Sequence, residues 1–283
     1  MNKQYRMSGF TIVETMIVMA VTGIMFISVV LLINGKQQRA QFQFAVKDVQ
    51  TQIRQIMTET TAGYNQLGNN TCSSFGGKPK LATGTTDTLG TNASCVFLGK
   101  TIIFSQDKES FLVAPVIGLR QPITTDFQGV FAADLNSSKP ILSTDTIASQ
   151  MMLQFGLSPV AMYVGDDLAQ KVGSVSFVLT PGVKDISPGN QGTTSQNLNI
   201  VAVTNGSSLA NSIDAERSAV ETAMQNGTVS SRDYINSTDD KVKVSICFNS
   251  GTTNQSLLLT IGNGGNGIGL GSKIYGVQNC GAA

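Results

Sequence analysis

The sequence has no histidine and no tryptophan, and only 13% of its 283 residues are charged. Without histidine the chain lacks the commonest general base and metal ligand, although carboxylates, Lys and Tyr remain. No spacing of Ser, Asp and Lys marks a nucleophile with its base. The 19 Lys and Arg nearly cancel the 18 Asp and Glu, which gives no electrostatic case for a nucleic-acid partner. We therefore expect no enzyme, no cofactor and no metal site.

Charge is scarcest near the N-terminus. Residues 1–9 are polar and basic, with Lys3 and Arg6, and the 24 residues from Phe10 to Ile33 carry a single charge, at Glu14. A helix of that length measures about 36 Å, and the hydrocarbon core of a bilayer is about 30 Å thick. We therefore predict a membrane-spanning helix over residues 10–33.

Two ordinary explanations of this segment are incomplete. A cleaved secretory signal has an apolar region of about 7–15 residues followed by small residues, whereas this run is longer and ends in Asn34-Gly35-Lys36. A plain membrane anchor explains the length but not Glu14, because a carboxylate inside an apolar span is costly and usually functional.

A third explanation accounts for both features. The stretch Gly9-Phe10-Thr11-Ile12-Val13-Glu14 resembles the type IV prepilin signature. The resemblance implies that a membrane-embedded prepilin peptidase cuts after Gly9 and methylates the new Phe10 amine. It also implies that Glu14 pairs with the Phe10 amine of a neighbouring subunit. Because a buried charge is tolerable only when paired, Glu14 would penalise subunits packed out of register.

The resemblance also implies partners and a location. The partners would be other pilin subunits and the inner-membrane assembly platform. The protein would be a single-pass protein of the cytoplasmic membrane with an extracytoplasmic domain, and later part of a periplasmic or extracellular filament. Major pilins often carry a proline where this chain has Leu31, and no proline precedes Pro79. That difference and the chain length favour a minor pilin or pseudopilin.

The helix is expected to continue beyond the membrane, over residues 34–62. Phe42, Val46, Val49, Ile53 and Ile56 recur at helical spacing and form one apolar face. Gly35 is the weak point, where a bend or local melting is expected, and the end is predicted near 61–63. This face would pack against a sheet.

Residues 63–283 are predicted to form a β-rich globular domain, which gives an α+β, pilin-like fold. Many of its strands alternate apolar and polar residues, as half-buried antiparallel strands do. A helix is predicted at Ile213–Gln225 after the cap Ser212, and a loop-rich insertion at 181–197. The predicted strands are 95–105, 111–117, 160–164, 175–180, 199–204, 242–248, 257–261 and 273–277.

The four cysteines are Cys72, Cys95, Cys247 and Cys280. In an exported chain an even number favours disulfides, and four cysteines allow three connectivities. We prefer Cys72–Cys95 and Cys247–Cys280, because each closes a short local loop; four free thiols are the alternative.

Two further motifs are interpreted as turns. Residues 262–267 match G-x-G-x-x-G, but no helix follows to hold a phosphate, so a hairpin loop is predicted. The pairs at 166–167 and 239–240 are Asp-Asp, which could help to bind calcium, but neither lies in a D-x-D-x-D-G loop.

The sequence therefore supports a structural subunit of a filament. A binding module at a filament tip, an adhesin or DNA-uptake pilin, is the alternative, because the domain is larger than in major pilins. An anchored extracytoplasmic enzyme has only domain size in its favour.

Overall fold

The structure is a computed structural model, and part of the chain is described. The described residues are 11–63, 70–75, 77–83, 95–105, 109–119, 138–143, 148–164, 172–180, 197–203, 209, 213–226, 234–235, 243–263 and 268–281.

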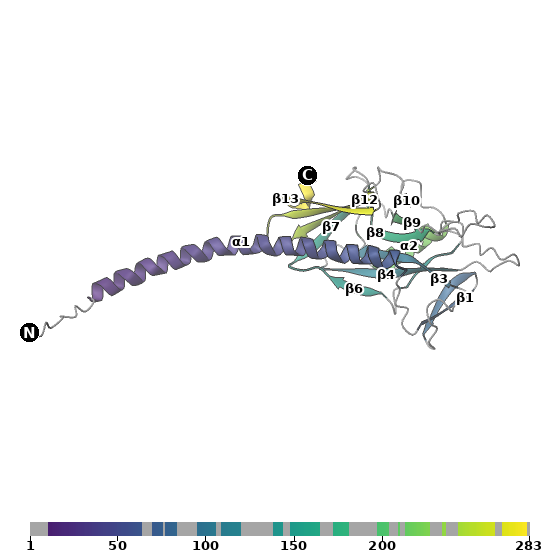
Figure 1. The fold of residues 1–283 in the computed structure, drawn as a ribbon, viewed down its shortest axis with the longest axis horizontal. Coiled ribbons are helices and arrows are strands. Elements are labelled where there is room, and N and C mark those ends of the chain that lie inside the picture. The colour runs from purple at the N-terminus through teal and green to yellow at the C-terminus, as the bar shows by residue number, and fades with distance from the viewer. Residues whose placement is uncertain are drawn as a thin grey trace, which may run out of the picture.

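The longest element is a single helix, α1 (Ile12–Thr61), which projects far from the domain at its N-terminal end (Figure 1). It continues through Gly35 without interruption, so the melting expected there does not occur. The helix ends where predicted, with the Ala62 N–H donating to the Thr58 carbonyl at 2.9 Å, and Gly63 follows at φ +66°. A glycine in the left-handed region after a helix is a common stop, because it has no Cβ.

The apolar face predicted for the second half of α1 is buried. Its members lie on one side of the helix, as a 3.6-residue period requires. They are Phe42, Val46, Val49, Ile53 and Ile56, and Ala45 is buried in the same cluster. The exposed residues of the same half are polar or charged except Ala40 and Phe44, and Phe44 is 63% exposed.

The larger sheet is antiparallel and has the strand order β10-β9-β8-β3-β4-β5, with β6 also paired to β4. Its strands are β3 (Cys95–Phe104), β4 (Ser110–Leu119), β5 (Ile141–Leu142), β6 (Ser149–Met152), β8 (Ser174–Thr180), β9 (Asn197–Val203) and β10 (Tyr234–Ile235). A bulge in β3 includes Gly99, where a Cβ would lie 1.9 Å from the Phe177 carbonyl oxygen, so only glycine fits.

A second antiparallel sheet has the order β13-β12-β11-β7. Its strands are β7 (Leu157–Val164), β11 (Lys243–Ser250), β12 (Ser256–Asn263) and β13 (Ile268–Tyr275). A separate hairpin pairs β1 (Asn70–Phe75) with β2 (Lys78–Thr83). Antiparallel pairing of β12 with β13 confirms the hairpin predicted in place of a phosphate loop.

The main core lies between α1 and the two sheets. Ile53 and Ile56 of α1 share one buried cluster with Phe104 and Phe177 of the large sheet and Phe248 of the second sheet. The other face of the large sheet is covered by α2 (Ile213–Asn226), through Val220 and Met224. The architecture is α+β, with a long N-terminal helix on antiparallel sheets, as predicted.

The predicted elements differ from the observed ones mainly at their ends. The helix begins at Ile12, with Thr11 as its N-cap. Strand β13 begins five residues before its predicted start at 273, and β7 begins three residues before 160. Ser212 and most of the insertion predicted at 181–197 lie outside the described residues. The sequence pattern predicts no strand at β1, β2, β5, β6 or β10.

Candidate assembly site on the N-terminal helix

The first half of α1 is apolar and has no cover within the described chain. The segment Ile12–Val30 has a mean hydropathy of 2.2 and is 0% buried, so it is long and apolar enough to cross a membrane. Its large side chains, for example Ile12 at 77% and Phe26 at 71%, remain exposed. Surface of this kind is typical of segments that lipid or other apolar helices cover.

The polar residues inside this segment are satisfied by the helix itself. The hydroxyls of Thr15, Thr22 and Ser28 donate to backbone carbonyls three or four residues earlier, at 2.8, 2.8 and 2.9 Å. Such local hydrogen bonds leave no unsatisfied donor in these side chains. This half of the helix can therefore be buried in an apolar environment with Glu14 as its one charged group.

Glu14 takes part in a capping box with Thr11. The Glu14 N–H donates to the Thr11 hydroxyl at 3.3 Å, while the Glu14 carboxylate accepts from the Thr11 N–H and hydroxyl, each at 3.1 Å. A carboxylate in the first turn also interacts favourably with the positive end of the helix dipole. Glu14 thus has a partner within its own chain.

The capping role of Glu14 was not identified from the sequence, although the sequence contains the pattern that predicts it. Thr11-Ile12-Val13-Glu14 matches the T-x-x-E pattern of a capping box directly before an apolar run. The capping box does not conflict with the pairing expected from the resemblance, because Glu14 is exposed. Gly9 and Phe10, the residues of the expected processing site, lie outside the described residues.

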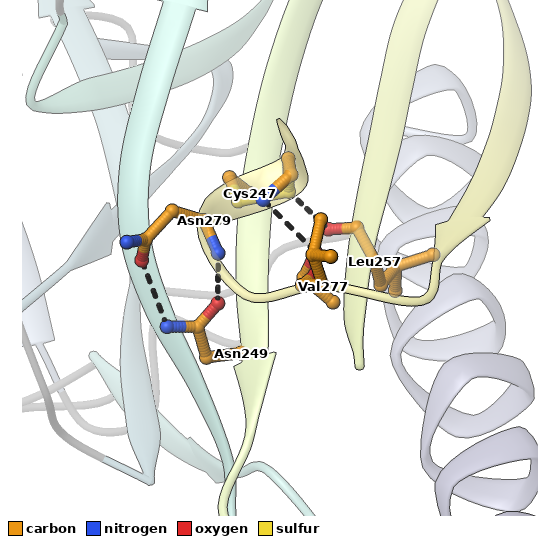
Figure 2. Close-up of a disulfide and its surroundings, with 7 residues drawn as sticks. Cys247, Asn249, Leu257, Val277 and Asn279 are labelled. Atoms are coloured by element: carbon orange, nitrogen blue, oxygen red, sulfur yellow. Dashed lines mark hydrogen bonds between the residues drawn. A yellow bond between two sulfur atoms is a disulfide. The ribbon is translucent and has the colours of Figure 1, made fainter. Parts of the chain in front are cut away.

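The C-terminal segment is held to the second sheet by a disulfide between Cys247 and Cys280 (Figure 2). Cys247 on β11 is completely buried and Cys280 is 6% exposed. The pair matches one of the two disulfides preferred from the sequence. The C-terminal residues are thereby fixed on the face of the sheet that points away from α1, beside Ala161 and Tyr163.

Hydrogen bonds hold the same segment on both sides of the disulfide (Figure 2). The Ser256 hydroxyl donates to the Val277 carbonyl at 2.6 Å and accepts from the Cys280 N–H at 2.9 Å. Asn249 and Asn279 are joined twice, at 3.0 and 2.8 Å. The segment from Val277 to Cys280 is therefore a fixed part of the domain.

The other predicted disulfide is described in part. Cys95, at the start of β3, is disulfide-bonded. The side chain of Cys72 lies outside the described residues. The Cys72–Cys95 pairing stays a prediction.

The last turns of α1 are tied to the large sheet by an ion pair between Glu59 and Lys100 on β3. Burial by itself raises the pKa of Glu59, but hydrogen bonds from Lys100 and Gln55, together with the charge of Lys100, outweigh it. The pKa of Glu59 is consequently lowered from its usual value of 4.5. This pair connects the helix to the domain.

The described residues contain no group of three or more His, Cys, Asp or Glu that could hold a metal ion. The Asp-Asp pairs at 166–167 and 239–240 lie outside them. Burial raises the pKa of Tyr163, which keeps this phenol neutral and unsuited to act as a base.

No family model, no curated protein and no solved structure matches this chain.

Proposed function

We propose that this protein is a structural subunit of a type IV pilus-like filament, a minor pilin or pseudopilin. In this proposal prepilin peptidase cuts the chain after Gly9, and the protein waits in the cytoplasmic membrane with its domain outside. The N-terminal half of α1 then packs among the helices of other subunits.

One observation carries the proposal. The segment Ile12–Val30 is apolar and uncovered, it bears Glu14 at its first turn, and the same helix continues without a break into the core of the domain. A membrane anchor alone needs neither the rigid connection nor the charge. A filament subunit needs both, because the helix must carry the domain at a fixed position and register.

Glu14 has a defined part in this proposal. In the separate subunit its carboxylate is held by Thr11. In the filament the same exposed carboxylate would pair with the Phe10 amine of a neighbouring subunit. Since the carboxylate has a partner in both states, the charge is tolerable before and after assembly.

The proposal is tested by the N-terminal sequence and intact mass of the protein from its native membrane. We expect a chain that starts at Phe10, with or without an added methyl group. A chain that still starts at Met1 in cells with an active prepilin peptidase would refute the processing step. A start beyond Ile33 would show instead that the apolar segment is a removed signal sequence.

A further inference from the structure

Two cations follow the apolar segment on an exposed stretch of α1. Lys36 and Arg39 are exposed, and the helix first becomes buried against the domain at Phe42. The two residues are three apart, so they lie on the same face of the helix. The domain therefore leaves both side chains accessible.

These cations have no acidic partner nearby. The sequence contains no Asp or Glu between Glu14 and Asp48. Neither Lys36 nor Arg39 forms an ion pair or a hydrogen bond with any described side chain. A pair of unneutralised cations on an otherwise neutral stretch attracts an anion.

The position of the pair along the helix indicates which anion. At 1.5 Å per residue, the apolar residues from Ile12 to Ile33 cover about 33 Å, close to the thickness of a hydrocarbon core. Lys36 and Arg39 then lie about 4.5 and 9 Å beyond that core. The polar headgroup layer is about 5–7 Å deep on each side, and long Lys and Arg side chains can extend toward it.

We infer that Lys36 and Arg39 form a binding site for anionic phospholipid headgroups in the leaflet on the domain side. This inference rests on the membrane insertion contained in the proposed function. The two contacts set the depth at which α1 sits in the bilayer. They are lost when the subunit leaves the membrane for a filament.

The same helix offers a matched control. Lys47 and Arg54 are also exposed, and they lie 11 and 18 residues after Lys36, which is about three and five helical turns. They therefore lie on the same side of α1 as Lys36, but about 21 and 32 Å beyond Ile33, outside the headgroup layer.

The test uses the full chain in nanodiscs with equal amounts of phosphatidylcholine and phosphatidylglycerol. Native mass spectrometry counts the lipids of each kind that stay bound to the protein. One variant carries Lys36→Gln and Arg39→Gln, and the other Lys47→Gln and Arg54→Gln. The basic residues of the leader are the same in every chain, so they do not affect the difference.

We expect the parent chain and the Lys47/Arg54 variant to retain phosphatidylglycerol in preference to phosphatidylcholine. In the Lys36/Arg39 variant the ratio of bound phosphatidylglycerol to bound phosphatidylcholine should fall by up to about 30-fold, roughly fivefold for each cation at low salt. An unchanged preference in the Lys36/Arg39 variant overturns the inference. An equal loss in both variants also overturns it, because the attraction would then be long-range.

Two other outcomes separate the inference from its premise. If alkaline carbonate extracts the parent chain from vesicles of the same lipids, the chain is not inserted, and both the inference and the membrane step of the proposed function fail. If the Lys36/Arg39 variant keeps its lipids but no longer enters filaments, the two cations contact a neighbouring subunit, and the headgroup assignment alone is wrong.

Discussion

Replacing both Cys247 and Cys280 by alanine removes the covalent link between β11 and the C-terminal segment. The double substitution leaves no unpaired thiol at this position to form a wrong disulfide. It also leaves the disulfide of Cys95 in place, which a reducing agent would not. Among the described residues, the side-chain hydrogen bonds of Ser256 and Asn249 then remain to hold the segment on the sheet.

The size of the effect follows from the loop that the disulfide closes. Cys247 and Cys280 are 33 residues apart in the sequence. In the chain-entropy model, a loop of that length raises the free energy of unfolding by about 3.7 kcal/mol at 25 °C. With a urea dependence of about 3 kcal/mol per molar, the unfolding midpoint should fall by about 1.2 M.

The assay is urea unfolding of the full chain in a mild detergent, followed by far-ultraviolet circular dichroism. Gln278→Ala is the control, because Gln278 is exposed in the same segment, and its midpoint should stay within the equivalent of about 0.5 kcal/mol. A midpoint decrease below about 0.3 M in the double variant would refute the reasoning. The C-terminal segment would then contribute little to the domain despite its burial.

Three further predictions concern α1. Glu14→Gln keeps a capping-box side chain but removes the charge. In cells that assemble the filament, both this variant and Glu14→Ala should be cleaved but should fail to enter filaments, and normal incorporation of either would contradict the charge pairing. Because the pKa of Glu59 is lowered, its ion pair with Lys100 stabilises the fold above about pH 4.5, and this contribution is lost as the pH falls through the lowered pKa. The free energy of unfolding, measured between pH 5 and 2, should therefore depend less on pH in Glu59→Gln than in the parent chain. Identical pH curves would exclude the pair as a contributor to stability. Ile53→Ala leaves a cavity at a fully buried site and should lower the free energy of unfolding, measured with urea, by about 2–5 kcal/mol. Phe44→Ala, on the exposed side of the helix, should change it by less than about 0.5 kcal/mol. Equal effects of the two substitutions would show that a different face of the helix packs on the sheets.

Much of α1 could be predicted from the sequence because its determinants are local. The apolar run sets the first half, and the spacing of Phe42, Val49 and Ile56 sets the buried face of the second. The capping box of Thr11 and Glu14 is equally local and could have been found in advance. The processing step at Gly9 stays a prediction.

The strands were predictable where they are long and rich in apolar residues, as in β3, β4 and β11. The strands β5 and β10 have two residues each, and β6 has four. A segment that short has no periodicity to detect, and it forms a strand only because it can pair with the edge of a neighbouring strand.

The sequence by itself determined the apolar first half of the helix, its charge at Glu14, the basic pair that follows, and the α+β class, because these depend on neighbours along the chain. Only the tertiary structure decided that β3 lies between β4 and β8, and that β11 lies between β7 and β12. It likewise selected Cys280 as the partner of Cys247 among three connectivities. These choices depend on which segments can bury their apolar faces together against α1, and that is a property of the whole packed core.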